Sequence, residues 1–301
     1  LHTLCNRHLR RRLPVFLVWR LPSLLTINKI YQDRISLVTI IHSKGGSDPP
    51  LLWYIKYMPR QPRNFENGGI YHIVNRGVEK RDIYLKPQDY SRFILGLEFC
   101  NTSEHVDIWN FINKADKETS DIFLSVSEKL KKQREENKRS DPIVELMAFT
   151  LMPNHYHLIV REIRENGISL FMQKIGGYTT YFNKQYDRVG PLFQSRYKSV
   201  VVKDDRQFMN TFVYVHTNPI ELIESRWKDM QVKNKKKAID WASSYKWSSY
   251  KNYLGEKNFS GVTKRDFFLE FFNGANGCKE VVEDWVSFKS DNAELGQEII
   301  E

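Results

Sequence analysis

Two histidines separated by a single tyrosine lie in the middle of the chain, in the apolar stretch FTLMPNHYHLIV (residues 149–160). Residues i and i+2 of a β-strand point to the same face, so a strand here would hold His155 and His157 side by side, with Tyr156 on the other face. Two nitrogen ligands on one rigid strand form half of a metal site. Two histidines that make ordinary hydrogen bonds at a strand end fit the same pattern, so the pair alone leaves both interpretations open.

A tyrosine and an asparagine four residues apart form a second candidate group, in the segment FVYVHTNPI (residues 212–220). At 3.6 residues per turn, Tyr214 and Asn218 would lie one above the other on a helix face, whereas His216 would point elsewhere. An amide oxygen with two imidazoles suits Mg²⁺ or Mn²⁺ and leaves positions for substrate oxygens, and a tyrosine one turn away could attack a phosphorus. A core tyrosine and an asparagine that caps a helix before Pro219 is the structural alternative.

The elements that must position these residues are predicted from hydrophobic periodicity and from the glycines and prolines between them. We expect strands at residues 69–76, 142–152, 155–161 and 196–203, and helices at residues 86–100, 168–186 and from 204 to near 219. This order, β-α-β-β-α-β-α, predicts an α+β fold of the ferredoxin-like type, with an antiparallel sheet and helices packed on one face. The two histidines would lie on a strand of the sheet and Tyr214 on a helix that follows it.

Charge is distributed unevenly along the 301 residues, of which 41% are apolar and 13% aromatic. The net charge is +7 over residues 1–57, +8 over residues 58–255 and −5 over residues 256–301. We interpret the first segment as a non-native or disordered extension upstream of Met58, with a basic DNA-binding arm as the alternative. The second is expected to be a catalytic domain, with a charged, solvated insertion at about 101–142, and the third an acidic helical segment.

The spacing of the cysteines and the hydropathy of the chain allow a prediction of where in the cell the protein is located. The three cysteines lie far apart and form no CxxC spacing, which indicates neither a disulfide framework nor a thiolate zinc site. No stretch approaches the roughly 20 apolar residues that a spanning helix needs. A cytoplasmic protein without a membrane partner is therefore expected.

Several motifs in a fixed order together resemble one family: GIYHIVNRG, MPNHYHLIV, GGYTTYFNKQYDRVGPLFQSRYKS, YVHTNP and YKWSSYKNYLG. The stretch from residue 58 to about residue 255 resembles the HUH single-tyrosine transposases, in particular the REP-associated tyrosine transposase branch with its IS200-like transposase domain. The resemblance implies an enzyme of DNA transposition and recombination that cleaves and rejoins single-stranded, hairpin-bearing DNA. It also implies a 5′-phosphotyrosine intermediate.

The resemblance assigns roles residue by residue. It makes Tyr214 the nucleophile, His155 and His157 metal ligands, and Asn218 the third ligand of Mg²⁺ or Mn²⁺, where some relatives carry glutamine. Some members of the wider family are dimers that exchange the tyrosine helix. A monomer and a homodimer are both compatible with the resemblance, so Tyr214 and the histidines could belong to one subunit or to two.

Contact with DNA is expected from basic and aromatic residues around this site, since single strands are bound by cations and by stacking surfaces. The expected residues are Lys174, Tyr178, Tyr181, Lys184, Arg188, Arg196 and Lys198, with Arg60 and Arg63 as a short arm or simply a charged terminus. Tyr178 is also the second candidate for the nucleophile, with packing or base stacking as its alternatives.

Other functions stay open at this point. A domesticated single-strand DNA-binding protein would use the same fold without catalysis. A metal-dependent nuclease would use the two histidines with water as the nucleophile, and a toxin-like RNA nuclease would require ribose in its substrate.

Overall fold

The computed structural model describes residues 64–106, 108, 128, 132, 141–229, 232–259 and 261–291. All of these belong to the unit Pro62–Glu301. The expected extension at residues 1–57, the expected start at Met58, the arm residues Arg60 and Arg63, and most of the insertion at 101–142 lie outside the described residues.

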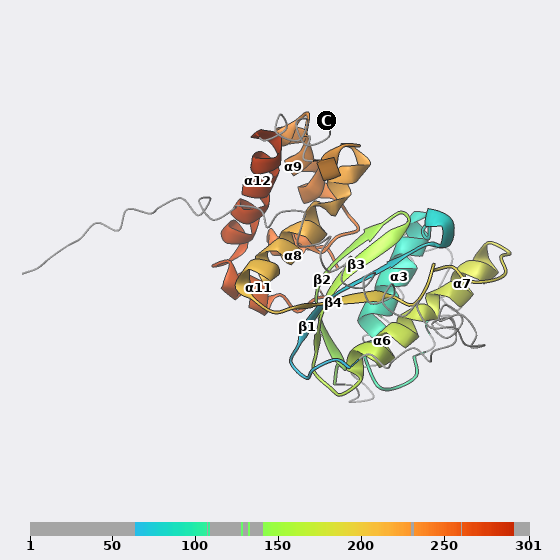
Figure 1. The fold of residues 1–301 in the computed structure, drawn as a ribbon. Coiled ribbons are helices and arrows are strands. Elements are labelled where there is room, and N and C mark those ends of the chain that lie inside the picture. The colour runs from blue at the N-terminus through green and yellow to red at the C-terminus, as the bar shows by residue number, and fades with distance from the viewer. Residues whose placement is uncertain are drawn as a thin grey trace, which may run out of the picture. The chain divides into compact units, whose positions relative to one another are not determined.

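The described residues form a four-stranded sheet in the order β2-β3-β1-β4, with every neighbouring pair antiparallel (Figure 1). The strands are β1 (Ile70–Arg76), β2 (Val144–Met152), β3 (His155–Glu162) and β4 (Lys198–Val202). β2 and β3 are joined by a tight turn at Pro153 and Asn154, as the sequence predicted. Because the chain order is β-α-β-β-α-β, the arrangement confirms the ferredoxin-like α+β prediction.

One face of the sheet is covered by α3 (Pro87–Phe99), α6 (Gly167–Gly176) and α7 (Tyr178–Gln185). Strand residues that point to this face, such as Ile73 and its cross-strand partner Leu158, join the helices in one hydrophobic core. The single helix predicted at 168–186 is instead two helices. Two consecutive glycines weaken the helix at this point, and the Gly177 N–H donates to the Lys174 carbonyl in a tighter, i to i−3 turn.

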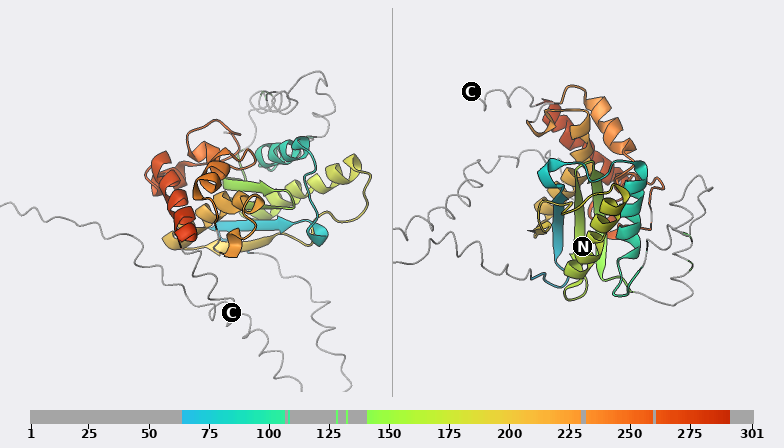
Figure 2. Two further views of the ribbon diagram at one scale, coloured as in Figure 1. Left: turned by 90° about the horizontal axis from the view of Figure 1, so that it is seen from above. Right: turned by 90° about the vertical axis from the view of Figure 1, so that its right-hand side faces the viewer.

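The opposite face of the sheet carries α8 (Asp205–Thr217), which corrects the expectation that the helices pack on one face only. α8 begins at Asp204, whose side chain accepts a hydrogen bond from the Gln207 N–H at 2.9 Å, and it continues into the 3₁₀ helix η3 (Asn218–Leu222). Phe212 and Val213 of α8 pack with Ile159 of β3 in a second core. The sheet therefore lies between two helical layers (Figure 2).

The C-terminal part is helical and packs on α8. It comprises the 3₁₀ helix η4 (Trp227–Asp229) and the helices α9 (Lys235–Ser244), α10 (Tyr250–Tyr253), α11 (Asp266–Phe271) and α12 (Ala275–Asp291). One further 3₁₀ helix, η2 (Val78–Lys80), lies outside this part and directly follows β1. α12 lies against α8 and α9, and its residues Cys278 and Val282 pack with Phe212 of α8. No helix among the described residues has the length and apolar composition needed to cross a membrane.

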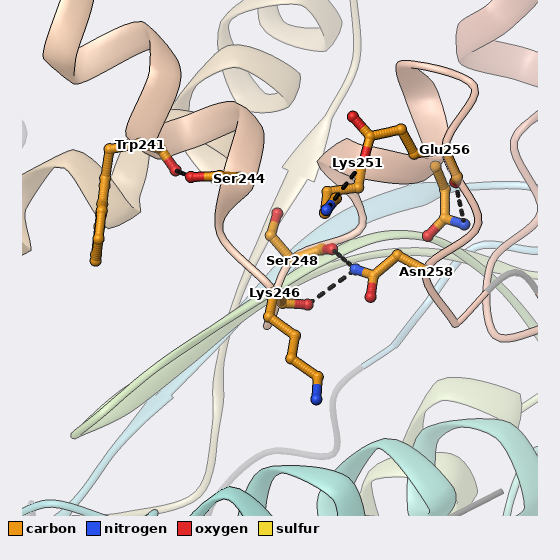
Figure 3. A network of polar contacts seen from close by, with 8 residues as sticks. Trp241, Ser244, Lys246, Ser248, Lys251, Glu256 and Asn258 are labelled. Carbon is orange, nitrogen blue, oxygen red and sulfur yellow. Dashed lines mark hydrogen bonds and ion pairs between the residues drawn. The ribbon is translucent and has the colours of Figure 1, made fainter.

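The segment between α9 and α11 is fastened to the outer edge of β2 (Figure 3). The Asn258 side-chain amide donates to the carbonyls of Lys246 and Ser248 at 2.8 and 2.9 Å, which fixes the shape of this segment. The Ser248 hydroxyl then meets the Thr150 hydroxyl at 3.0 Å, and the two residues form an isolated β-bridge. Hydrogen-bonding groups at this edge of the sheet are thus paired with side chains and backbone of the same chain.

Candidate active site

The two central histidines lie on the α8-facing side of β3, as strand periodicity predicted. Tyr156 points to the other side and packs against Phe93 of α3, with ring centroids 5.0 Å apart. The imidazoles of His155 and His157 have centroids 4.9 Å apart and are nearly perpendicular, and both side chains are buried. A rigid central strand therefore holds two nitrogen donors in one small volume.

α8 brings the tyrosine and the asparagine to these histidines. The Asn218 side-chain oxygen lies 3.3 Å from Nε2 of His155, and the Tyr214 ring centroid lies 5.1 Å from that of His157 at an interplanar angle of 87°. Asn218 is buried, whereas Tyr214 is 44% exposed. Tyr214 is therefore not a core residue and is open to a large substrate. Asn218 is the C-cap of α8, as the structural alternative predicted, and its side chain also faces His155.

The donor set fits a divalent cation. Nδ1 of His155 lies 2.6 Å from the Asn154 side-chain oxygen, an acceptor, so the Nδ1–H tautomer satisfies this contact and leaves a lone pair on Nε2. That lone pair faces a second acceptor, the Asn218 oxygen. Two converging acceptors are an arrangement that a cation stabilises. No group of three or more His, Cys, Asp or Glu side chains suited to a metal occurs in the described part of the chain.

A third histidine belongs to the site and was missed by the sequence prediction. Nε2 of His72 on β1 lies 2.9 Å from Nδ1 of His157, and the two rings lie edge to edge, with centroids 5.1 Å apart and only 19° between their planes. Burial lowers the pKa of His72 to about 4, which keeps the ring neutral near pH 7. The signal that could have found it is strand pairing: Val74 is opposite His157, so His72, two residues earlier, points to the same face.

Two cations flank the histidines on the same face of the sheet. Arg76 is directly opposite His155 in the β1·β3 pairing, and Lys198 is opposite Val74, which is itself opposite His157. Directly opposed residues of antiparallel strands share a face. Lys198 was among the predicted DNA contacts, whereas Arg76 was not predicted, because its pairing with His155 depends on a register that the sequence does not display.

Tyr178 is not a surface residue, which corrects its assignment as a DNA contact. Its side chain is 2% exposed, and its hydroxyl donates to the Ile83 carbonyl at 2.6 Å. Burial raises the pKa of the Tyr178 hydroxyl well above its usual value. It belongs to α7, on the face of the sheet away from the histidines, so it is also excluded as the nucleophile of this site.

The other predicted DNA contacts divide by location. Lys174 donates to the carbonyls of Thr102 and Glu104, and the Tyr181 hydroxyl donates to Asp89 at 2.9 Å. These two residues, with Lys184 and Arg188, belong to α6, α7 or the turn that follows, across the sheet from His155 and His157. Arg196 is exposed just before β4. Lys174, Tyr181, Lys184 and Arg188 therefore lie away from the histidine site, whereas Arg196 does not belong to those helices.

His216 secures α8 without entering the site. Its Nε2 lies 2.9 Å from the Ser249 hydroxyl, and that serine also accepts from the Phe149 N–H of β2 at 2.9 Å. The ring is fully buried, and burial lowers the pKa of His216 to about 3. These bonds connect α8 to β2 through the segment after α9, and so help to set the position of Tyr214 over the sheet.

Comparison with known proteins gives one family match. Residues 110–218 match the model of a family described as "Transposase IS200 like", a range that includes His155, His157, Tyr214 and Asn218. Among solved structures, the one described as "Structure of the REP associates tyrosine transposase bound to a REP hairpin" is similar over 67% of this chain and 90% of that chain. The sequence identity is 15% and the TM-score is 0.36. No curated protein sequence matches the chain.

Proposed function

We propose, from the match of residues 110–218 to the family model described as "Transposase IS200 like", that the chain is a metal-dependent DNA strand transferase. Its substrate would be single-stranded DNA that bears a hairpin, and its intermediate a 5′-phosphotyrosine on Tyr214. The similar solved structure is described as bound to a REP hairpin, which makes hairpin DNA of this kind the first substrate to test.

The observation that carries the proposal is the convergence of three elements at one point. β3 supplies two imidazoles, α8 supplies an exposed phenol 5.1 Å from the His157 ring, and η3, which continues α8, supplies an amide oxygen 3.3 Å from His155. A buried ligand set beside a half-exposed tyrosine is the combination that phosphoryl transfer to a tyrosine requires.

His155, His157 and Asn218 would hold Mg²⁺ or Mn²⁺, which when bound supplies positive charge toward the oxygens of the scissile phosphate. The Tyr214 hydroxyl loses its proton and attacks the phosphorus, forming a new P–O bond. The bond to the 3′ oxygen breaks, and that oxygen takes up a proton and leaves as a hydroxyl. One phosphodiester is exchanged for another, so a 3′-hydroxyl can later attack the phosphotyrosine, restore the tyrosine and rejoin the strand without ATP.

Arg76 and Lys198 would hold the DNA backbone on either side of the scissile phosphate. Both lie on the histidine-bearing face, in the cross-strand rows of His155 and His157. A guanidinium binds phosphate oxygens in bidentate fashion and an ammonium binds them as a point charge. These contacts would position the strand without reading its sequence.

The test uses the full-length chain, Mn²⁺ and single-stranded hairpin DNA labelled at either end, followed by a denaturing gel. With a 3′ label, the proposal expects a labelled band at the size of the protein. With a 5′ label, it expects a shortened free strand that ends in a 3′-hydroxyl. Tyr214→Phe and His157→Ala should abolish both products. Tyr178→Phe, a tyrosine on the other face of the sheet, is the matched control and should keep both.

Two results would contradict the proposed function and would each identify a different one. Cleavage that persists in Tyr214→Phe with no protein-linked band would identify water as the nucleophile and a metal-dependent nuclease. Tight binding of hairpin DNA by the wild type, with no product on either label, would identify a single-strand DNA-binding protein that uses this fold without catalysis.

A further inference from the structure

We propose that His72 is the positioning residue that sets the tautomer of His157, so that Nε2 of His157 is the metal-binding nitrogen. The inference rests on the proposed function, since it gives His72 a task within the same site. His72 acts through its contact with Nδ1 of His157, where the two nitrogens are 2.9 Å apart.

Only one direction of this hydrogen bond is compatible with a ligand at His157. A neutral imidazole has one N–H and one lone pair, so either His157 or His72 donates. If His157 Nδ1 donates to His72 Nε2, then the lone pair of His157 is on Nε2. If His72 donates instead, then His157 carries its proton on Nε2, and that nitrogen cannot bind a metal.

The neighbouring histidine shows which direction the site uses. The Asn154 oxygen lies 2.6 Å from Nδ1 of His155, closer than the 3.3 Å between Nε2 and the Asn218 oxygen, so we assign the proton to Nδ1, which leaves Nε2 facing Asn218 at the start of η3. His72 acts on His157 in the same way: its Nε2 accepts from Nδ1 of His157, as the Asn154 oxygen accepts from Nδ1 of His155. Both ligands are then held through Nδ1 and bind through Nε2, in the way that outer-shell acceptors usually orient metal-binding histidines.

His72 also helps to orient the nucleophile. The Tyr214 ring stands edge-on to both imidazoles, at 78° and 5.7 Å from His72 and at 87° and 5.1 Å from His157. Because the two imidazoles lie edge to edge with only 19° between their planes, they present one continuous surface to the phenol. The hydrogen bond that fixes the tautomer of His157 therefore also fixes the surface against which Tyr214 packs.

Two variants separate the hydrogen bond from the ring contact. His72→Phe keeps a flat ring of similar size beside Tyr214 but removes the nitrogen that accepts from His157. His72→Gln removes the ring but keeps an amide oxygen that can accept the same proton. A purely packing role for His72 would make the phenylalanine variant the better substitute, whereas the proposed role makes the glutamine variant the better one.

The primary measurement is the long-range ¹H–¹⁵N NMR spectrum of the histidines in the metal-free, full-length protein, with the His157 signals identified by their loss in His157→Ala. We expect the Nδ1–H tautomer of His157 in the wild type and in His72→Gln, and loss of that preference in His72→Phe. Mn²⁺ titration followed by electron paramagnetic resonance should show affinity about 10- to 100-fold weaker in His72→Phe and within about threefold of wild type in His72→Gln.

An Nε2–H tautomer of His157 in the wild type, or an unchanged Nδ1–H tautomer in His72→Phe, would overturn the inference. Equal Mn²⁺ affinity in the wild type and His72→Phe would overturn it as well. If the wild type binds no Mn²⁺, then the proposed function fails, while the tautomer spectra still decide whether His72 controls His157.

Discussion

At the scale of single residues, the chemistry depends on what each polar group faces. Asn218 is a neutral amide whose side-chain oxygen points at the Nε2 lone pair of His155 in a buried position. A neutral third ligand leaves the site with no negative charge of its own, so no buried carboxylate lacks a partner when the metal is absent. Replacing the amide by a carboxylate would change that balance.

We expect Asn218→Asp to make stability depend on the metal. Without a cation, a buried carboxylate beside His155 is desolvated, and the variant should unfold at a lower temperature than the wild type. With Mn²⁺ the carboxylate gains a partner, and the rise in melting temperature on adding Mn²⁺ should exceed that of the wild type. Thermal unfolding of both proteins with EDTA and with Mn²⁺ measures the effect, and Asn218→Ala, which has no third ligand, should show a smaller rise than either. An equal rise in all three proteins would remove Asn218 from the ligand set.

We expect Arg76→Gln to weaken DNA binding and to change its salt dependence. Loss of one phosphate contact should lower the slope of log affinity against log salt by about 1. Fluorescence anisotropy with a labelled single strand over a range of salt concentrations measures this slope. Lys279→Gln, on α12 and paired with Glu283 at 3.7 Å, is the control and should leave the slope unchanged. If both variants keep the slope of the wild type, Arg76 does not touch the backbone.

At the scale of elements, the position of α8 decides whether Tyr214 meets the histidines at all. α8 is held by apolar packing on β2 and β3 and by the polar chain from His216 through Ser249 to Phe149. Burial holds the pKa of His216 near 3, so this chain operates with a neutral imidazole at ordinary pH. The segment that carries Ser249 is itself fixed by Asn258, as Figure 3 shows.

We expect Ser249→Ala to lower the free energy of unfolding by about 1–3 kcal/mol, because it leaves buried groups of His216 and Phe149 without their partner. Ser244→Ala removes a similar hydroxyl from an exposed position, where it donates to the Trp241 carbonyl at 3.2 Å, and should change stability by no more than about 0.5 kcal/mol. Urea denaturation followed by circular dichroism compares the two variants. Similar losses in both would show that the bonds of Ser249 do not secure α8.

At the scale of the whole molecule, the site is complete within one chain. β1, β3 and α8 of the same polypeptide supply His72, His157 and Tyr214, whose rings are within 5.7 Å of one another. α8 is enclosed by its own sheet on one side and by its own α12 on the other. In this arrangement the proposed catalysis would use residues of a single subunit, without exchange of the tyrosine helix.

Mixing two inactive variants tests this arrangement. Tyr214→Phe retains the histidines and His157→Ala retains the tyrosine, so a site shared between subunits would be restored in mixed dimers. We expect an equimolar mixture, incubated long enough to allow exchange, to form no protein-linked band on a denaturing gel. Recovery of the adduct toward about a quarter of the wild-type amount would show instead that Tyr214 of one copy serves the histidines of another.

The sequence by itself determined what depends on local periodicity. The period of two along β3 placed His155 and His157 on one face, and the period of 3.6 along α8 placed Tyr214 and Asn218 on another, because side-chain direction follows from the backbone geometry of neighbouring residues. The alternation of strands and helices likewise gave the ferredoxin-like order. The glycines at 176 and 177 marked the point where the structure has two helices instead of the one predicted.

Only the tertiary structure decided what depends on pairing between distant segments. The register of β1 against β3 places His72 and Arg76 beside the two histidines. Tyr178 is buried and cannot belong to the expected DNA-binding surface, because α7 packs on the face of the sheet away from the histidines. The sequence pattern also did not indicate that α8 packs on the face of the sheet opposite to α3, α6 and α7. Strand register and layer placement are set by the packing of apolar surfaces more than 60 residues apart, such as Ile159 of β3 and Phe268 of α11, and no short stretch of the chain records them.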